Sequence, residues 1–269
     1  CRPDISHSVI KLTQYNHRPA RCHYEAIMQI YTYLKATKDQ GITYWRRSPN
    51  TILPYTTPPT PTEETYNVNT PAEHNSTSPY TTVDSDWAGD HATRKSVSGV
   101  SIIIAGAAVV YKTILQRTVA LSSTKAEFYA LSEAGKLTLY VRTILEELGF
   151  PQEEATTIYE DNAGCLHMAN TFKPTKRTRH VELRHFAVLD WVENDLLKIK
   201  KIHTSDNCSD ALTKNLARIL FHRHTDTLMG KRQPQYNGPI TIRILQHKND
   251  QYSIQHLYDD YNTDQGGVL

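Results

Sequence analysis

The chain has 269 residues, of which 39% are hydrophobic and 22% charged, a composition that suits a globular protein with a buried core. Its 30 Lys and Arg residues nearly cancel 28 Asp and Glu residues, so the net charge of +2 identifies no partner by itself. No stretch approaches the ~20 apolar residues of a membrane span, and nothing near Cys1 has the pattern of a signal peptide, so we expect no membrane partner. The four cysteines form no CxxC pair, which argues against a disulfide scaffold and favours a reducing intracellular setting.

The first 47 residues and the stretch that follows them differ sharply in composition. Apolar residues at helical spacing predict helices over Ile5–Tyr15 and Cys22–Leu34, and Gly41–Trp45 has the composition of a strand. A segment of this length hardly buries a core alone, so we expect residues 1–47 to belong to a larger domain. Thr and Pro dominate residues 48–79, which predicts an extended linker.

Residues 80–230 show the alternating pattern of an α/β domain, and the polar tail, residues 231–269, has the composition of a disordered segment. A run of apolar and small positions spaced by 3 and 4 predicts one long helix. The expected elements are strands over Tyr80–Trp87, Val97–Ala105 and Ala107–Lys112, a helix over Thr124–Leu148, a strand over Thr156–Tyr159, helices over Asn162–Asn170 and Val181–Asp195, a strand over Leu197–His203, and helices from Ser205 to Asn215 and on to Met229.

This order predicts a mixed five-stranded sheet with helices on both faces. The first three strands follow one another directly and are expected to form an antiparallel meander, with Gly106 at the second turn. The fourth and fifth strands return through helical crossovers, so we expect them to lie parallel to the first.

Four acidic residues take special places in this arrangement. Asp84 lies inside the first strand, where Asp is disfavoured, and Asp161 directly follows the fourth strand. Glu127 lies near the start of the long helix and Asp210 near the start of a later one. Ligands in open α/β sheets bind at the carboxyl ends of parallel strands, where these side chains are expected to converge. Converging carboxylates repel one another, and a hard divalent cation such as Mg²⁺ relieves that repulsion.

Each acid also has a purely structural interpretation. Glu127 completes the pattern Thr124-x-x-Glu127, which is a capping box. Asp161 and the following Asn162 suit the cap of the next helix, and Asp210 suits the positive end of a helix dipole. Taken one at a time, the structural interpretations are the more common, so spacing alone leaves both open.

Several sequence motifs around these acids help to decide between a metal site and purely structural roles. They are Val83-Asp-Ser-Asp-Trp-Ala-Gly-Asp, Lys95-Ser-Val-Ser-Gly, Val119-Ala-Leu-Ser-Ser-Thr-Lys-Ala-Glu-Phe, Ile158-Tyr-Glu-Asp-Asn and Asp210-Ala-Leu-Thr-Lys. Together they resemble the ribonuclease H region of copia-type (LTR) retrotransposon Pol polyproteins. Arg2-Pro-Asp-Ile resembles the end of the reverse transcriptase region that precedes it, so residues 1–47 are interpreted as a C-terminal remnant of that region. Lys125 departs from the family pattern, because an acid is common at that position.

The resemblance implies a ribonuclease H-like α/β fold over residues 80–230 and cleavage of the RNA strand of an RNA–DNA hybrid. It implies that Asp84, Glu127, Asp161 and Asp210 are both the catalytic and the metal-binding residues. The expected cofactors are two Mg²⁺ (or Mn²⁺) ions, bridged by Asp84, with Glu127 and Asp161 at one ion and Asp210 at the other. The reverse transcriptase region of the same polyprotein is the expected protein partner. No Tyr-x-Asp-Asp motif occurs, so DNA synthesis by this chain alone is not expected.

A basic segment is the predicted contact for the nucleic acid. Its cations can bind phosphates, although a short charge run is also common at a solvated helix entry. Ser123 and Asn162 are further candidate contacts. The basic residues are Lys173, Lys176, Arg177, Arg179 and Arg184.

Two other function classes compete with an active ribonuclease H. The first is an inactive retroelement fragment that retains the fold and nucleic-acid binding only. The second is a DNA transposase or integrase, which shares a similar sheet but orders its acids as Asp, Asp, Glu along the chain. Here Glu127 comes second, which favours the ribonuclease H order.

Overall fold

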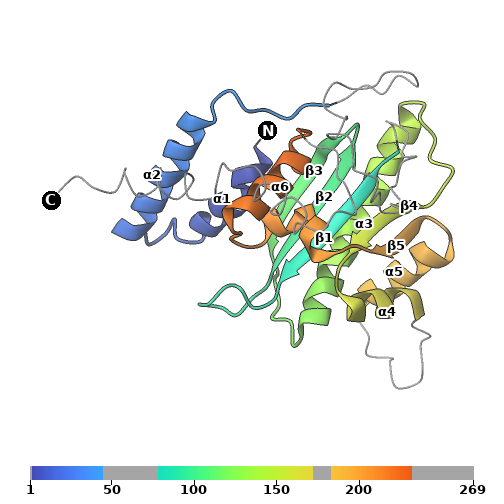
Figure 1. Cartoon of the computed structure of the whole chain (residues 1–269). Helices are drawn as coiled ribbons and strands as arrows, with labels where there is room; N and C mark the ends of the chain where they lie inside the picture. The colour runs from blue at the N-terminus through green and yellow to red at the C-terminus, as the bar shows by residue number, and fades with distance from the viewer. Residues whose placement is uncertain (1, 45–77, 172–182, 232–269) are drawn as a thin grey trace, which may run out of the picture.

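The centre of the protein is a five-stranded sheet (Figure 1). The computed structural model describes residues 2–44, 78–171 and 183–231. The strands are β1 (Tyr80–Asp86), β2 (Val97–Ile104), β3 (Ala107–Leu115), β4 (Thr156–Glu160) and β5 (Leu197–Lys201).

The sheet has the strand order β3-β2-β1-β4-β5. β1 pairs antiparallel with β2, and β2 with β3, whereas β4 lies parallel to β1 and to β5. The β2–β3 hairpin turns through Ala105 and Gly106, both with positive φ, as a tight two-residue turn requires. These pairings confirm the predicted fold class, a mixed α/β sheet with three antiparallel strands first.

Helices cover both faces of this sheet (Figure 1). On one face lie α3 (Ser123–Glu147), α4 (Ala163–Thr171) and α5 (Leu183–Glu193), and on the other lie the 3₁₀ turns η3 (Thr204–Asp206) and η4 (Cys208–Leu212) with α6 (Arg218–Leu228). Residue alternation along the strands explains the two layers, because Ile158 packs with Phe128 of α3 while its neighbour Tyr159 packs with Leu228 of α6.

The structure overturns two local predictions. Residues 41–44 form no strand, although the Thr43 N–H donates to Met229 O just after α6 and the Tyr44 hydroxyl donates to Ala108 O on β3. The predicted helix over Ser205–Asn215 is replaced by η3 and η4, since the Asn207 side chain donates to Val83 O (2.8 Å) and accepts from Ser209 N–H, which fixes short turns against β1.

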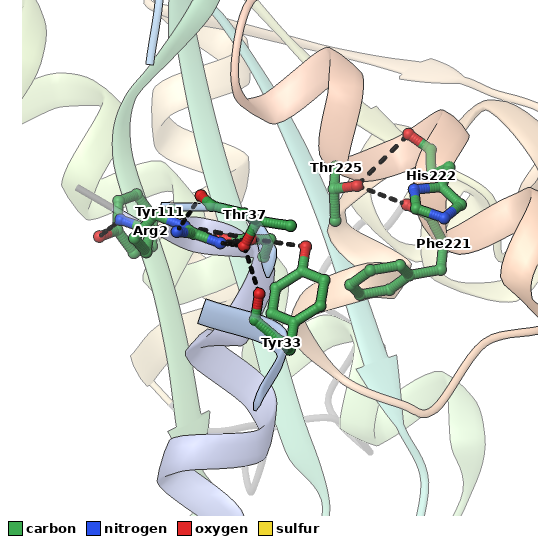
Figure 2. Close-up of polar contacts among 8 residues, drawn as sticks. Arg2, Tyr33, Thr37, Tyr111, Phe221, His222 and Thr225 are labelled. Carbon is green, nitrogen blue, oxygen red and sulfur yellow. Dashed lines mark hydrogen bonds and ion pairs between the residues drawn. The ribbon is translucent and has the colours of Figure 1, made fainter. Parts of the chain in front are cut away.

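The N-terminal residues pack against β3 and α6 (Figure 2). They form η1 (Pro3–Ile5), α1 (Ser6–Thr13) and α2 (Arg21–Ala36). The Arg2 guanidinium pairs with buried Asp4 (2.7 Å) and donates to Thr37 O (3.0 Å), while Arg2 N–H donates to the Tyr111 hydroxyl on β3 (3.3 Å). The Tyr33 ring meets Phe221 of α6 edge-on, 6.3 Å between centroids. A segment interpreted as a remnant of another region is therefore docked on this sheet.

The boundaries predicted for the remnant, the linker and the tail remain predictions. Most of the linker and almost all of the tail lie outside the described residues. Among the helices that are described, none combines the length and apolar character needed to cross a bilayer.

Gly230 provides a test of the docking. Its φ is +71°, and a Cβ there would lie 1.9 Å from Thr43 O. We expect Gly230→Ala to lower the free energy of unfolding by about 2–4 kcal/mol, since backbone strain and a clash with the N-terminal segment add. Gly149→Ala is the matched control, because Gly149 also has positive φ (+84°) but open space around it, and should cost about 1–2 kcal/mol. Urea unfolding measures both, and equal losses would contradict docking at Gly230.

Candidate metal centre

Three predicted acids meet at one end of the sheet. β1 and β4 are neighbouring parallel strands, so Asp84 near the end of β1 and Asp161 just after β4 come to the same edge. The second turn of α3 brings Glu127 over it. Each of the three offers a carboxylate oxygen, and these oxygens lie within 4.8 Å of one another. The predicted convergence is thus present for Asp84, Glu127 and Asp161.

The start of α3 decides between the two interpretations of Glu127. The helix is capped by Ser122, whose hydroxyl accepts from Lys125 N–H (3.2 Å). Glu127 is therefore beyond the cap and buried at 6% exposure, so the alternative interpretation of Thr124 and Glu127 as a capping box does not hold. A buried carboxylate facing other carboxylates has no structural use of its own, since it costs free energy unless a cation or proton neutralises it.

The electrostatics of the site reflect this crowding. Burial, followed by the charges of Glu160 and Asp84, raises the pKa of Glu127 to about 11. Burial also raises the pKa of Asp161, although a hydrogen bond from Thr204 opposes the shift. Without a cation, the site therefore favours protonated carboxyl groups over a full set of charges.

Glu160 is a fifth acid of the site, which the sequence reasoning did not single out. It ends β4 fully buried, and its Oε1 accepts from Asn162 N–H (3.0 Å). Burial raises its pKa to about 8, and its charge in turn raises the pKa of Glu127. The only sequence signal was the alternation along β4, which places Glu160 on the same face as the core residue Ile158.

Glu160→Gln should stabilise the metal-free protein above neutral pH. The folded pKa of Glu160 lies above its unfolded value, so its contribution to stability is full below about pH 4.5 and is lost as the pH rises through about 8. A neutral Gln can still accept from Asn162 N–H and carries no charge. We expect a gain of about 1–2 kcal/mol at pH 8.5 and little change at pH 5, measured by urea unfolding in EDTA. A gain of the same size at both pH values would argue against this origin.

Asp210 takes a different place from the other three predicted acids. It lies on η4, buried, and its Oδ1 pairs with Lys214 Nζ at 3.2 Å. The same Nζ lies 3.5 Å from Asp84 Oδ1, while the Thr213 hydroxyl donates to Asp84 Oδ2. Burial and the charge of Asp84 raise the pKa of Asp210 to about 8 against the effect of Lys214. Asp210 is therefore joined to Asp84 through a lysine and is not a member of the three-acid group.

The predicted nucleic-acid contacts are tested only in part. Ser123 is exposed at the start of α3, beside the site. Asn162 caps α4, because its Oδ1 accepts from Cys165 N–H at 2.9 Å, so the structural interpretation of this residue holds. The remaining predicted residues, Lys173, Lys176, Arg177, Arg179 and the Arg184 side chain, lie outside the described part of the chain.

The donor set suits a hard divalent cation. The ligand atoms that Asp84, Glu127 and Asp161 bring together are all carboxylate oxygens, which Mg²⁺ and Mn²⁺ prefer. Within the described residues, Glu127 Oε2 and Glu160 Oε2 are buried without a hydrogen-bond partner. Buried oxygens of this kind are normally satisfied, so their orphaned state is consistent with a cation between them and Asp84.

The strand order and the carboxylate group at the ends of β1 and β4 define a mixed α/β protein with a candidate centre for a divalent cation. The homologues of the chain are copia-type retrovirus-related Pol polyproteins from transposons, which confirms the resemblance in the sequence motifs. The polyprotein from transposon TNT 1-94 of Nicotiana tabacum is 30% identical over 220 residues, which are 82% of this chain and 14% of that protein. The polyprotein from transposon RE2 of Arabidopsis thaliana is 27% identical over 242 residues, 90% of this chain and 15% of that protein.

The chain thus spans only a small part of the length of these polyproteins. Secreted RxLR effector protein 161 of Plasmopara viticola is 32% identical over 133 residues, 49% of this chain and 75% of that protein. No protein-family model matches the chain. Among solved structures, LC11-RNase H1 in complex with an RNA/DNA hybrid shares 13% identity with a TM-score of 0.36, over 48% of this chain and 88% of that one.

Proposed function

We propose that residues 80–230 are a metal-dependent endonuclease that cleaves the RNA strand of RNA–DNA hybrids. The observation that carries the proposal is the meeting of Asp84, Glu127 and Asp161 within 4.8 Å at the carboxyl ends of β1 and β4. Homology to retrovirus-related Pol polyproteins supports a nuclease of retroelement origin. The hybrid as substrate follows from the resemblance of the motifs around these acids.

The residues of the chain have distinct roles in this proposal. Asp84, Glu127 and Asp161 would hold one Mg²⁺ or Mn²⁺ ion, and Asp84 with Asp210 would hold a second. Bound ions would activate a water molecule and stabilise charge on the leaving 3′ oxygen. The Thr213 hydroxyl, bonded to Asp84 Oδ2, fixes the rotamer of Asp84.

The surroundings of the acids also fix a neighbouring carboxylate. The backbone N–H of Asn162 donates to Glu160 Oε1, which holds Glu160 in place at the end of β4. Burial of Asp84 and Glu127 at 2% and 6% exposure limits how much water shields their charges, so a cation is attracted strongly.

Substrate binding is proposed to rely on the basic residues 173–184, whose cations can contact phosphates. The reverse transcriptase region of a Pol polyprotein remains the proposed protein partner. The packing of residues 2–44 on β3 and α6 is consistent with that region and the nuclease lying side by side.

A cleavage assay tests the proposal directly. The chain is incubated with an end-labelled RNA–DNA hybrid in Mg²⁺, in Mn²⁺ and in EDTA, with double-stranded DNA and double-stranded RNA as control substrates. We expect cleavage of the RNA strand of the hybrid, dependent on the divalent ion, and little cleavage of either control. Binding of the hybrid without any cleavage would instead indicate the inactive retroelement fragment.

A further inference from the structure

Lys214 lies where a second cation is expected. Its ammonium nitrogen is 3.2 Å from Asp210 Oδ1 and 3.5 Å from Asp84 Oδ1, so one positive charge spans two buried carboxylates. The two carboxylate side chains are 2% and 3% exposed, whereas the Lys214 side chain is 35% exposed. The Lys214 side chain therefore extends from the surface into the site, and its ammonium group contacts the buried carboxylates.

The backbone of Lys214 is fixed, but its tip can leave. Lys214 N–H donates to Asp210 O at 3.2 Å, which anchors the residue at the end of η4. Four methylene groups separate that anchor from the ammonium, and a lysine with a half-exposed side chain can rotate into solvent. The residue can thus withdraw its charge without any change in the sheet or in η4.

The three-acid group and the lysine-bridged pair therefore differ in charge. In the three-acid group, only Asp84 forms an ion pair with a basic residue of the described part of the chain, and that residue is Lys214. The Asp84–Asp210 pair already has a cation in contact. At the first position, Glu127 and Asp161 have no ion pair with a described basic residue that a divalent ion would have to break. At the second position, the ion must compete with the Lys214 ammonium for both Asp84 and Asp210.

We propose that Lys214 is a built-in counter-cation that occupies the second cation position of the metal-free protein. Divalent ions then bind in two unequal steps. The first ion enters among Asp84, Glu127 and Asp161, and the second enters between Asp84 and Asp210 only as Lys214 swings out. This inference rests on the proposed metal-dependent function and adds an order of binding to it.

Mn²⁺ binding to the whole chain without nucleic acid tests the proposal. Calorimetry and the electron paramagnetic resonance signal of free Mn²⁺ give the number of bound ions and their affinities. We expect the wild type to bind one ion strongly and a second weakly, and Lys214→Met to bind the second about tenfold more tightly or better, because a charge within 4 Å is removed. Lys214→Arg, which keeps the charge, should resemble the wild type.

Lys125→Met is the matched control. It removes a positive charge at the exposed start of α3, from a residue that has no ion pair to the described acids. It should leave both Mn²⁺ steps unchanged. Equal binding by Lys214→Met and the wild type would overturn the inference while leaving the nuclease proposal intact if cleavage still requires metal. Absence of Mn²⁺ binding in both proteins would overturn the inference and the proposed metal site together.

A measurement on the wild type covers the case in which Lys214→Met does not fold. In protein labelled with ¹⁵N-lysine, the ammonium resonance assigned to Lys214 should stay constant during the first step of a Mg²⁺ titration and shift during the second. A shift complete in the first step, or no shift at saturation, would contradict displacement of Lys214.

Discussion

Asp84→Asn is expected to reduce hybrid cleavage by about 10³-fold or more while the protein stays folded. Asp84 is the one acid that belongs both to the three-acid group and to the pair bridged by Lys214. An Asn has a single acceptor oxygen and no charge, so it weakens both cation positions at once. The measurement is single-turnover cleavage of the RNA strand in saturating Mg²⁺, together with circular dichroism and thermal unfolding of the variant.

Asp86→Asn is the matched control for this prediction. Asp86 ends the same strand two residues later, is half-buried, and lies outside the three-acid group. Its loss should change the cleavage rate only a few-fold. Comparable losses in the two variants would show that general charge at this edge, and not the geometry at Asp84, supports the reaction. Full activity of Asp84→Asn would refute the assignment of the site.

Mg²⁺ and Mn²⁺ are expected to stabilise the folded chain, and to do so more strongly at higher pH. Burial and neighbouring charges raise the pKa of Glu127 to about 11 and of Asp210 to about 8 in the metal-free protein. Both folded pKa values lie above the unfolded ones, so the stability that these two carboxyl groups contribute is full below about pH 4 and is lost as the pH rises towards 8 and beyond. A divalent ion binds the ionised carboxylates and removes that loss.

The measurement is thermal unfolding from pH 5 to pH 9 in EDTA and in excess Mg²⁺. The melting temperature in EDTA should fall as the pH rises, and the increment due to Mg²⁺ should grow from near zero at pH 5 to several degrees at pH 8.5. Asp84→Asn should abolish most of the increment. An increment that is independent of pH, or that persists in Asp84→Asn, would place the ion elsewhere on the protein.

Local patterns in the sequence were sufficient for the elements that bear most of the site. Burial left a local pattern in each of these elements: the strand-like composition of Tyr80–Asp86, the long helical repeat around Glu127 and the short apolar run before Asp161. Both strands, β1 and β4, are buried on both faces. The handedness and shortness of connections then leave few ways to arrange the strands. That is why the directions of the strands could be predicted before any coordinates, and why three of the four acids expected to converge do so.

Local patterns failed where a long-range contact overrides them. A helix was predicted around Asp210, but the Asn207 side chain bonds to Val83 O on a strand 124 residues away, and η4 forms instead. The helical patterns in residues 2–44 do not indicate which surface these helices pack against. Only the structure shows that this segment packs against β3 and α6.

The sequence alone thus determined the class of fold, because burial leaves periodic patterns in the order of apolar and polar residues, and its motifs supplied the candidate acids. Only the tertiary structure decided how the charges are balanced. Glu160 becomes a buried fifth acid, and Lys214 links Asp210 to Asp84, because folding brings charges from separate strands and turns within 4 Å. Coulomb energies depend on the distance between charges and on their burial, and neither quantity can be derived from the spacing of residues along the chain.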